Sequence, residues 1–456
     1  MPSIREFAIQ IRERRMTAEE LVEQCLDAIA RRDGEINAFI TVLADEARSR
    51  ARQADREISH GQDLGILHGM PLSIKDLIDM EGQPTTAASK VRVGHRATSD
   101  APGLARLVAA GGVVVGKCNL HEFAFGTTGE DSAFGPTRNP RAIGHMAGGS
   151  SSGSAASVAA GMALASIGTD TGGSIRIPAA ACGVVGLKPT LGELNTDGIV
   201  PLAPTLDHVG PLGLTVDDVA VIYRVMAGDY IAAEEIPRHG PTTDHRHSAP
   251  RLGVPRRHFL DLLDIDVRRT FEGAVARLRD SGCLIDEVSI PHADTIATTY
   301  RHIQLYEAFQ VHQHTLETRA DAYSLDVYER LLSGNALSKQ DYQRARQDRR
   351  VLRAEVDTAL QGVSAIVLPT LAFPAPSLGS EHVVLGGQVV DLRSASLRLT
   401  QLFNLTGHPA ISLPSGTNPG GLPCGTQLVG KRSETAALLE LAARYELVIG
   451  PADPGR

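Results

Sequence analysis

The sequence predicts an α/β fold: a single large α/β/α sandwich with a mixed, mostly parallel central sheet flanked by helices. Short apolar runs rich in β-branched residues, such as GGVVVGKC (111–118) and VSAIVLPT (363–370), alternate with longer helical patterns such as APGLARLVAAGG (101–112). This alternation is typical of a sheet with helices on its faces. A chain of 456 residues could hold several average domains, but large α/β enzymes often form one continuous core, so we expect a single domain over 1–456.

The first part of the chain, 1–60, is predicted to be a mainly helical segment. The sequence TAEE (17–20) fits a capping box, and the apolar residues after it follow helical spacing. INAFITVL (36–43) has the composition of a strand, whereas ADEARSRARQADREI (44–58) has that of a charged surface helix.

The rest of the chain divides into a core, an insertion and a return to the core. Strand-like runs and helical patterns alternate over 61–227 and resume over 361–456. The intervening region, 228–360, opens with a polar stretch, PRHGPTTDHRHSAPR (237–251), and continues into charged helices such as LSKQDYQRARQDRRVLRAEVDTAL (337–360). We therefore expect one core built from both ends of the chain, with a helical insertion between them.

Composition and charge exclude several classes of protein. The net charge is −8 and no sustained basic run occurs, which argues against nucleic-acid binding. Five scattered cysteines without a CxxC pair argue against a disulfide framework or a zinc site, and favour a reducing compartment. The N-terminus is not that of a signal peptide, and no apolar run is hydrophobic enough for a membrane span. We expect a cytoplasmic protein with no nucleic-acid and no membrane partner.

The most unusual stretch is rich in glycine and serine and runs from 144 to 190. It is not a phosphate-binding loop of the P-loop type, because no lysine lies between Gly148 and Ser174. GSSSG (149–153) matches the nucleophile-elbow pattern G-x-S-x-G, but that elbow needs a buried strand directly before it, and here a polar loop precedes it.

A third interpretation uses the second half of the stretch. GMALASIGTD (161–170) reads as a short buried strand that leads into Thr171-Gly172-Gly173-Ser174. A glycine turn at a strand end lets the backbone approach a substrate, and it directs consecutive N–H groups into one space, as in an oxyanion hole. Ser174 would be well placed as a nucleophile, but no histidine follows in this stretch to serve as its base.

Several segments of the sequence together resemble the amidase signature family. GGSSSGSAASVAAG followed by GTDTGGSIRIPAAACGVVGLKPT resembles the family's defining block almost residue for residue. GILHGMPLSIKDLIDMEGQPTTAASK resembles the region that carries the family's lysine, and NLTGHPAISLPSG fits near the C-terminus. The resemblance covers most of 10–220 and 360–445, and it implies the family's fold and amide hydrolysis without a cofactor or a metal.

The resemblance also implies the site residues. The family's Ser–cisSer–Lys triad falls on Ser174 as nucleophile, Ser150 as proton bridge at a non-proline cis peptide, and Lys75 as base. The backbone N–H groups from Thr171 through Gly172 and Gly173 to Ser174 would form the oxyanion hole. A lysine acts as a base only when neutral, and burial among the apolar neighbours of Lys75 would favour that form.

Two further residues, Gly126 and Arg176, are candidates for substrate binding. Arg176 lies two positions after the predicted nucleophile, where it would either hold a substrate carboxylate or form a structural ion pair. We expect Asp170 to orient the turn rather than to act as an acid or base. The insertion at 228–360 is expected to lie near the substrate pocket.

The substrate does not follow from the resemblance. We expect a small carboxamide or ureido-type compound as the substrate, and we include a homodimer because homodimers are common in such enzymes. The alternatives are the glutamine-hydrolysing subunit of a tRNA-dependent amidotransferase and a non-catalytic subunit with this fold. That amidotransferase subunit usually has Gln where this sequence has Ile177, and a YGRVSRYG-like run where this sequence has LGELNTDG (191–198), which favours a free-standing hydrolase.

Overall fold

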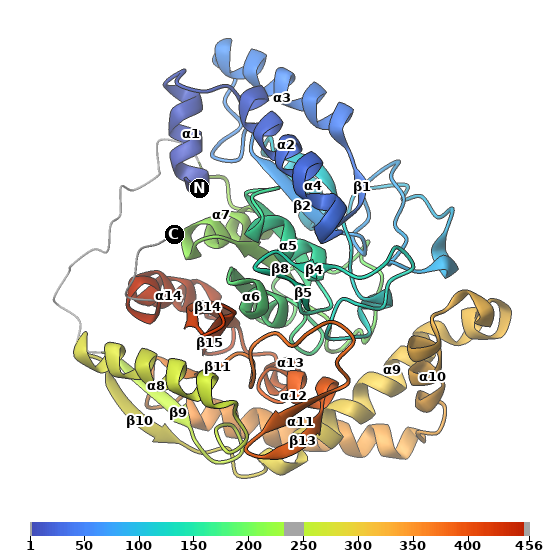
Figure 1. Ribbon diagram of the computed structural model, residues 1–456, viewed down its shortest axis with the longest axis vertical. Coiled ribbons are helices and arrows are strands. Elements are labelled where there is room, and N and C mark those ends of the chain that lie inside the picture. The colour runs from blue at the N-terminus through green and yellow to red at the C-terminus, as the bar shows by residue number, and fades with distance from the viewer. Residues whose placement is uncertain (1, 232–249, 451–456) are drawn as a thin grey trace.

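A large mixed sheet with helices on both faces forms the centre of the molecule, as the computed structural model shows for residues 2–231 and 250–450 (Figure 1). This arrangement confirms the predicted α/β sandwich. In spatial order the eleven strands are β1 (Phe39–Val42), β3 (Val113–Cys118), β2 (Pro71–Lys75), β6 (Ala165–Thr169), β8 (Val209–Gly213), β7 (Val185–Lys188), β14 (Ala410–Thr417), β15 (Pro423–Val429), β11 (Ala365–Pro369), β9 (Arg251–Pro255) and β10 (Leu284–Val288).

The sheet is mixed, as expected, but the expectation that most of its strand pairings are parallel is wrong. Four pairings are parallel (β2–β3, β2–β6, β9–β10 and β9–β11), and the other six are antiparallel. The reason lies in the connections. β7 and β8, and likewise β14 and β15, follow each other without an intervening α-helix, and a parallel pair needs a crossover connection.

The helices cover both faces of this sheet. They are α1 (Ile4–Arg12), α2 (Ala18–Ile36), α3 (Ala44–Ser59), α4 (Pro102–Ala109), α5 (Ser152–Ala159), α6 (Arg176–Cys182), α7 (Val216–Ala227), α8 (Ile265–Asp280), α9 (Ile296–Thr318), α10 (Leu325–Gly334), α11 (Lys339–Ala359), α12 (Leu392–Leu397), α13 (Gln401–Thr406) and α14 (Thr435–Ile449). The predicted capping box is present at α2, where Thr17 and Glu20 cap each other.

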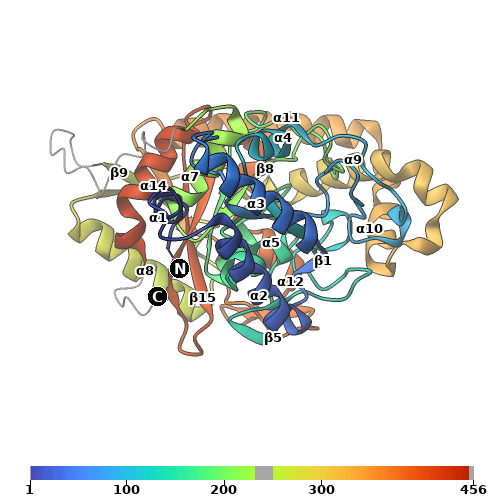
Figure 2. The ribbon, with the colours of Figure 1, turned by 90° about the horizontal axis from the view of Figure 1, so that it is seen from above.

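Alternation along β2 assigns α4 and α7 to one face of the sheet and α5 to the other. Ile74 shares a small cavity with Leu104 of α4 and Met226 of α7. Its neighbour Ser73 points the other way, and its hydroxyl lies 2.9 Å from that of Ser157 in α5. Because successive residues of a strand face opposite sides, Lys75 must point to the side of α5. Figure 2 shows α4 and α11 along one side of the molecule and α2 along the other.

The region 228–360 is not only a helical insertion. It supplies two strands, β9 and β10, to one edge of the sheet, in addition to α8, α9, α10 and α11. The sequence signal for these strands is weak because β10 is half-exposed and carries Asp286 and Glu287. α9 and α10 lie at the lower right in Figure 1. Most of the polar stretch 237–251 lies outside the described residues.

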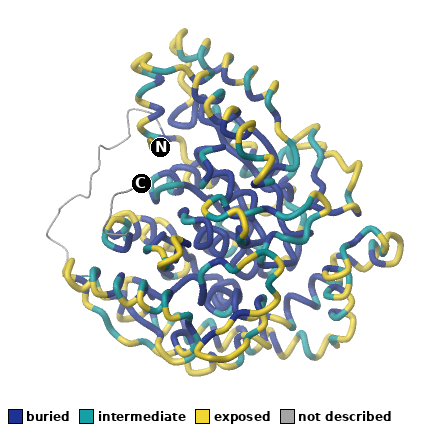
Figure 3. Tube along the Cα trace, viewed as in Figure 1, coloured by how far each residue is buried: buried dark blue, intermediate teal, exposed yellow. Residues whose placement is uncertain are grey.

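Burial follows the layers. Figure 3 shows the central strands and the helices α5 and α6 as almost continuously buried, whereas the outer helices alternate between buried and exposed residues. All five cysteines are buried and form no disulfide, as expected. None of the helices in the described part of the chain is long and apolar enough to cross a membrane.

Candidate active site

The predicted base lies at the carboxyl end of a central strand. Lys75 is the last residue of β2, and Thr169 is the last residue of β6, which pairs with β2 in parallel. Two neighbouring parallel strands therefore end side by side, an arrangement that commonly positions functional groups in α/β folds. Lys75 is fully buried, and its Nζ is surrounded by three hydroxyl groups, at 2.8 Å from Ser150 Oγ, 3.0 Å from Ser151 Oγ and 2.8 Å from Thr169 Oγ1.

This environment favours the uncharged form of Lys75. Burial lowers its pKa well below the ordinary value of 10.5, and the opposing effects of Asp170 and Asp207 do not offset the burial. A neutral amine carries two hydrogens and one lone pair. Ser151 donates its own hydrogen to the Thr169 carbonyl oxygen, at 3.1 Å, so it accepts a hydrogen bond from Nζ. Nζ can then donate to Thr169 as well and accept the hydrogen of Ser150.

Ser150, the predicted proton bridge, lies two residues before the start of α5. The peptide bond between Gly149 and Ser150 is cis, as the resemblance implies. Ser150 is fully buried, and its hydroxyl is a near neighbour of the lysine amine, whereas its carbonyl oxygen accepts a hydrogen bond from the N–H of His121, at 3.2 Å. Ser151, which the sequence suggested only as a helix-start residue, and Thr169, which it did not single out, complete the lysine's surroundings.

The predicted nucleophile, Ser174, lies two residues before α6, and its backbone contacts the residue that follows the proton bridge. Ser174 is less buried than Lys75 and Ser150, with 6% of its surface exposed. Its carbonyl oxygen accepts a hydrogen bond from the N–H of Ser151, at 3.1 Å, which ties the two segments together. Its hydroxyl makes no hydrogen bond with another described residue. The Lys75–Ser150 contact is thus formed, but the Ser150–Ser174 hydroxyl contact is not, and such catalytic contacts often tighten only when substrate binds.

The turn before Ser174 contains a row of backbone N–H groups that have no hydrogen-bond acceptor in the described part of the protein. In residues 2–231 and 250–450 no protein group accepts a hydrogen bond from the N–H groups of Thr171, Gly172, Gly173 or Ser174. Glycine is required at positions 172 and 173 because other side chains approach the backbone closely there. A methyl group on Gly172 would lie 2.1 Å from the Tyr300 hydroxyl, and one on Gly173, whose φ is +139°, would lie 2.3 Å from Thr400 Oγ1. This geometry is suited to binding an oxyanion.

Arg176 does not face the site. It is fully buried, and its five N–H hydrogens are all engaged: Nε and Nη2 donate to the Asp170 carboxylate, at 3.0 Å each, and the remaining hydrogens to other buried oxygens. Those oxygens belong to Thr400, Asn404 and Gln427. No hydrogen is left for a substrate carboxylate, so the substrate-binding assignment of Arg176 is wrong and the ion-pair interpretation holds.

Asp170 holds the turn in place. Its carboxylate accepts hydrogen bonds from the backbone N–H groups of Ile175 and Arg176, at 3.1 and 3.4 Å, in addition to the guanidinium. Burial alone would raise the pKa of Asp170, but the neighbouring Arg176 lowers it overall, so the carboxylate is ionised. The expected orienting role of Asp170 agrees with these contacts.

Tyr300 lies against Gly172 of this turn, and a chain of contacts leads from it through Gln304 to Arg393 and, at Phe125, to Arg330. The sequence analysis missed all four residues. Tyr300 and Gln304 come from α9, Arg330 from α10 and Arg393 from α12. Gln304 donates to the Tyr300 hydroxyl, at 2.6 Å, and accepts from Arg393, at 3.1 Å. No local sequence signal marks them, since they are single polar residues in ordinary helices.

Gly126, the other candidate for substrate binding, lies beside these arginines. Arg330 and Arg393 both donate to the carbonyl oxygen of Phe125, and both guanidinium groups lie 5.3 Å from the centre of its ring. Gly126 itself is packed against a histidine, because a methyl group on it would lie 2.0 Å from Nε2 of His121. A contact of Gly126 with substrate stays a prediction.

His121 belongs to a group of potential metal ligands. Ligand atoms of His121, Asp131 and Asp326 lie within 4.8 Å of one another. Asp326 is paired with Arg330, and Asp131 accepts a hydrogen bond from Ser324, at 2.6 Å. Burial, and then the charges of Arg330 and Arg393, lower the pKa of His121 well below its ordinary value, so the imidazole is neutral at neutral pH. We assign no metal to this group.

Comparison with known proteins matches the chain to a family. The model of the Amidase family matches residues 20–439. A curated relative from Acidobacterium capsulatum, named as the A-type subunit of glutamyl-tRNA(Gln) amidotransferase, is 37% identical, and the match covers 98% of each chain. A crystal structure of an amidase matches with a TM-score of 0.91 and 36% identity, over 98% of this chain and 100% of that one. The corresponding glutamyl-tRNA(Gln) amidotransferase subunit from Thermotoga maritima matches with a TM-score of 0.75 and 33% identity, over 94% and 91% of the two chains.

These relatives contradict the predicted partners. The sequence predicted a small-molecule amide substrate and excluded nucleic acid because of the net charge of −8 and the lack of a sustained basic run. Relatives covering nearly the whole chain are named as subunits, and their names include a tRNA. Net charge is a poor criterion here because it averages over the whole surface and says nothing about a local basic region or about a partner bound by another subunit.

Proposed function

The chain belongs to the amidase family, and we propose that it hydrolyses an amide through an acyl-enzyme on Ser174, with Ser150 as proton bridge and Lys75 as general base. One observation carries this proposal: a fully buried lysine amine, with its pKa held low, lies 2.8 Å from the hydroxyl of a serine whose neighbour contacts Ser174. A surface lysine would be charged and unable to take a proton.

The reaction follows from this arrangement in two steps. Ser174 Oγ attacks the amide carbon while its proton passes to Ser150, and the proton of Ser150 passes to Lys75. The oxyanion accepts hydrogen bonds from the N–H groups of residues 171–174, and the C–N bond breaks as the relay returns a proton to the leaving nitrogen. Water then attacks the ester by the same relay, which releases the carboxylic acid and restores Ser174.

The arginines beside Phe125 support a substrate that carries a carboxylate. Arg393 has no carboxylate within ion-pair distance among the described residues, whereas Arg330 is paired with Asp326. Burial, together with Arg330, lowers the pKa of Arg393 to about 10, so it remains charged at neutral pH. A partly buried cation without an anionic partner is costly, and a substrate carboxylate would supply that partner.

Two candidate substrates fit this description. Glutamine, hydrolysed within an amidotransferase that acts on a tRNA, is supported by the names of the curated relatives. A small carboxamide or ureido compound, hydrolysed by the chain alone, is supported by the higher TM-score to the amidase structure and by Ile177 and LGELNTDG (191–198) at positions where the amidotransferase subunit usually differs.

Measuring ammonia release from a panel of amides distinguishes the two candidate substrates. We would incubate the purified chain with glutamine, with neutral primary amides and with amides or ureido compounds that carry a carboxylate, using Ser174→Ala as the blank. Turnover of a small amide by the chain alone favours the free-standing hydrolase. Turnover of glutamine only after addition of partner subunits favours the amidotransferase subunit. If no ammonia is released from any amide, with or without such partners, the proposal is wrong.

A further inference from the structure

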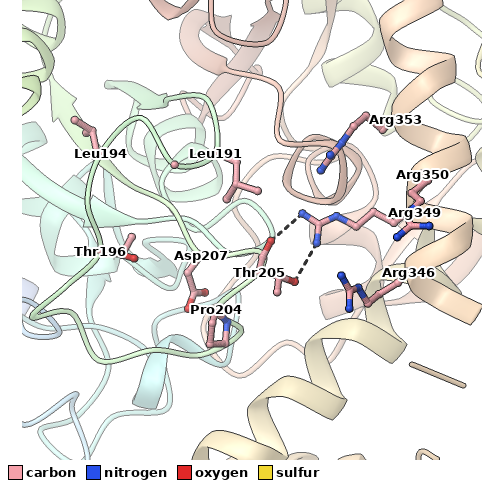
Figure 4. A pocket seen from close by; sticks show the side chains of 11 residues that line it. Leu191, Leu194, Thr196, Pro204, Thr205, Asp207, Arg346, Arg349, Arg350 and Arg353 are labelled. Carbon is pink, nitrogen blue, oxygen red and sulfur yellow. Dashed lines mark hydrogen bonds between the residues drawn. The ribbon is translucent and has the colours of Figure 1, made fainter. Parts of the chain in front are cut away.

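A second cavity lies on the side of the molecule where α11 packs against the loop between β7 and β8. Its volume is about 380 Å³, within the range of pockets that hold small molecules. Figure 4 shows the loop with Thr205 and Asp207 on one side and four arginines of α11 on the other. None of these arginines belongs to the candidate active site.

The four arginines form one face of the helix. Arg346, Arg349, Arg350 and Arg353 follow the spacing i, i+3, i+4, i+7, so their side chains emerge on the same side over about 10 Å of helix length. Arg349 is buried and donates to the carbonyl oxygen of Thr205, at 2.8 Å, and to its hydroxyl, at 3.0 Å (Figure 4). This contact fixes the helix against the loop and leaves the other guanidinium groups around the cavity.

Negative charge in the cavity is scarce. Arg346 and Arg350 are exposed and have no carboxylate within ion-pair distance among the described residues. The carboxylate of Asp207 in the wall is already engaged, since it accepts from the N–H groups of Leu202, at 2.9 Å, and Ala203, at 3.1 Å, and from the Thr171 hydroxyl, at 2.6 Å.

The positively charged arginines around the cavity repel one another. Burial and the charge of Arg353 lower the pKa of Arg349 to about 10, and burial with the charge of Arg432 lowers the pKa of Arg353. A bound anion would offset both effects. Guanidinium groups bind phosphate and carboxylate through paired hydrogen bonds, and several on one face suit a ligand with more than one such group.

We propose that this cavity binds a small oxyanion that carries at least two phosphate or carboxylate groups. A concave site of this size, walled on its far side by a loop, favours a free small molecule over the backbone of a nucleic acid. The site lies close to the predicted oxyanion hole, because Asp207 in its wall bonds to Thr171. Binding is therefore expected to change the rate of amide hydrolysis. This expected effect on the rate rests on the proposed function, whereas the binding of the anion does not depend on it.

Calorimetry on the purified chain tests the binding directly. Pyrophosphate and citrate serve as separate probes, so that a phosphate site and a carboxylate site are distinguished. The test variant is Arg346→Gln/Arg350→Gln, and the matched control is Arg344→Gln, which removes an exposed arginine of the same helix that does not line the cavity. Arg349 is left unchanged because it contacts the loop. If the double variant fails to fold, Arg350→Gln alone replaces it.

We expect the parent and the control variant to bind one equivalent of at least one probe, and the double variant to bind about tenfold or more weakly. Absence of binding to the parent, equal binding by the double variant, or equal weakening in the control variant would overturn the proposal. So would a tRNA that binds through Arg346 and Arg350 when neither probe binds. If a probe binds but leaves the rate of ammonia release unchanged, the coupling through Asp207 is wrong and the site stands.

Discussion

At the scale of single residues, the proposed chemistry depends on the protonation of Lys75. Among the described residues its Nζ donates hydrogen bonds only to hydroxyl groups, and burial lowers its pKa more than the charges of Asp170 and Asp207 raise it. Sequence predicted the residue, its burial and its neighbour Ser150. It could not predict Thr169 and Ser151 as further neighbours, because those contacts require β6 to end beside β2.

Lys75→Met is expected to lower kcat by about 10³-fold, since general-base catalysis contributes roughly 10²–10⁴-fold. For the parent, kcat/KM should rise with pH through the lowered pKa of Lys75 and then level off, because only the neutral amine accepts a proton. The residual activity of Lys75→Met should lack this rise. A pH–rate profile of the variant that matches the parent's would exclude Lys75 as the base.

The same residue makes stability depend on pH. Between the lowered pKa of Lys75 and its ordinary value of 10.5, the unfolded chain binds one more proton than the folded chain, so stability increases with pH in this window. The slope due to Lys75 reaches at most about 1.4 kcal/mol per pH unit, and Lys75→Met should lack it. Urea unfolding of both proteins at several pH values measures the difference. Parallel slopes would show that Lys75 is charged in the folded protein.

At the scale of elements, the oxyanion turn is held between β6 and α6 by a buried ion pair. Asp170 ends the strand side of the turn and Arg176 begins the helix, and their contacts fix the intervening residues 171–175. The sequence left two interpretations of Arg176 open, because position in the chain does not reveal which oxygens surround a guanidinium. Asn404 and Gln427, which decide the question, lie more than 220 positions away.

Arg176→Met is expected to reduce the free energy of unfolding by about 3–5 kcal/mol, because it leaves the Asp170 carboxylate buried without its partner. Denaturant unfolding measures the loss. The double variant Asp170→Asn/Arg176→Met should lose less than the sum of the two single variants, since it removes both charges. Additive losses, or an Arg176→Met variant as stable as the parent with only KM raised, would instead support a substrate contact.

Helix α12 contributes Arg393, whose role can be tested by the choice of substrate. Arg393→Gln should raise KM for an amide that carries a carboxylate by about tenfold or more, and should leave a neutral amide nearly unaffected. Arg398→Gln is a suitable control. Arg398 is a partly buried arginine that directly follows the same helix, and it donates a hydrogen bond to the carbonyl oxygen of His258. Equal effects on both substrates would indicate a structural role for Arg393.

At the scale of the whole molecule, the sheet interleaves the two ends of the chain. β14 and β15, from the C-terminal part, lie between β7 on one side and β11, β9 and β10 on the other. The alternation of strand and helix patterns was sufficient to predict the layered fold. The sense of each pairing was not predictable from local patterns, because it depends on whether a connection crosses the sheet.

A chain truncated to residues 1–360 should therefore lose its cooperative unfolding transition. The truncation removes β11, β14 and β15, so β9 and β10 no longer join the rest of the sheet and the strand β7 becomes an exposed edge. Circular dichroism during urea unfolding, compared with the full chain, measures the transition. A sharp transition in the fragment would show that the N-terminal region folds on its own and that the single core is wrong.

The most direct test of the central claim is kcat/KM of Ser174→Ala on whichever amide the protein hydrolyses best. Ser152→Ala is the matched control, since Ser152 lies in the same run of serines and its hydroxyl donates to Thr137 rather than facing Lys75. We predict that Ser174→Ala lowers kcat/KM by about 10³-fold or more, with Ser152→Ala close to the parent. Ammonia release by Ser174→Ala within about tenfold of the parent would contradict the assignment of Ser174 as the nucleophile.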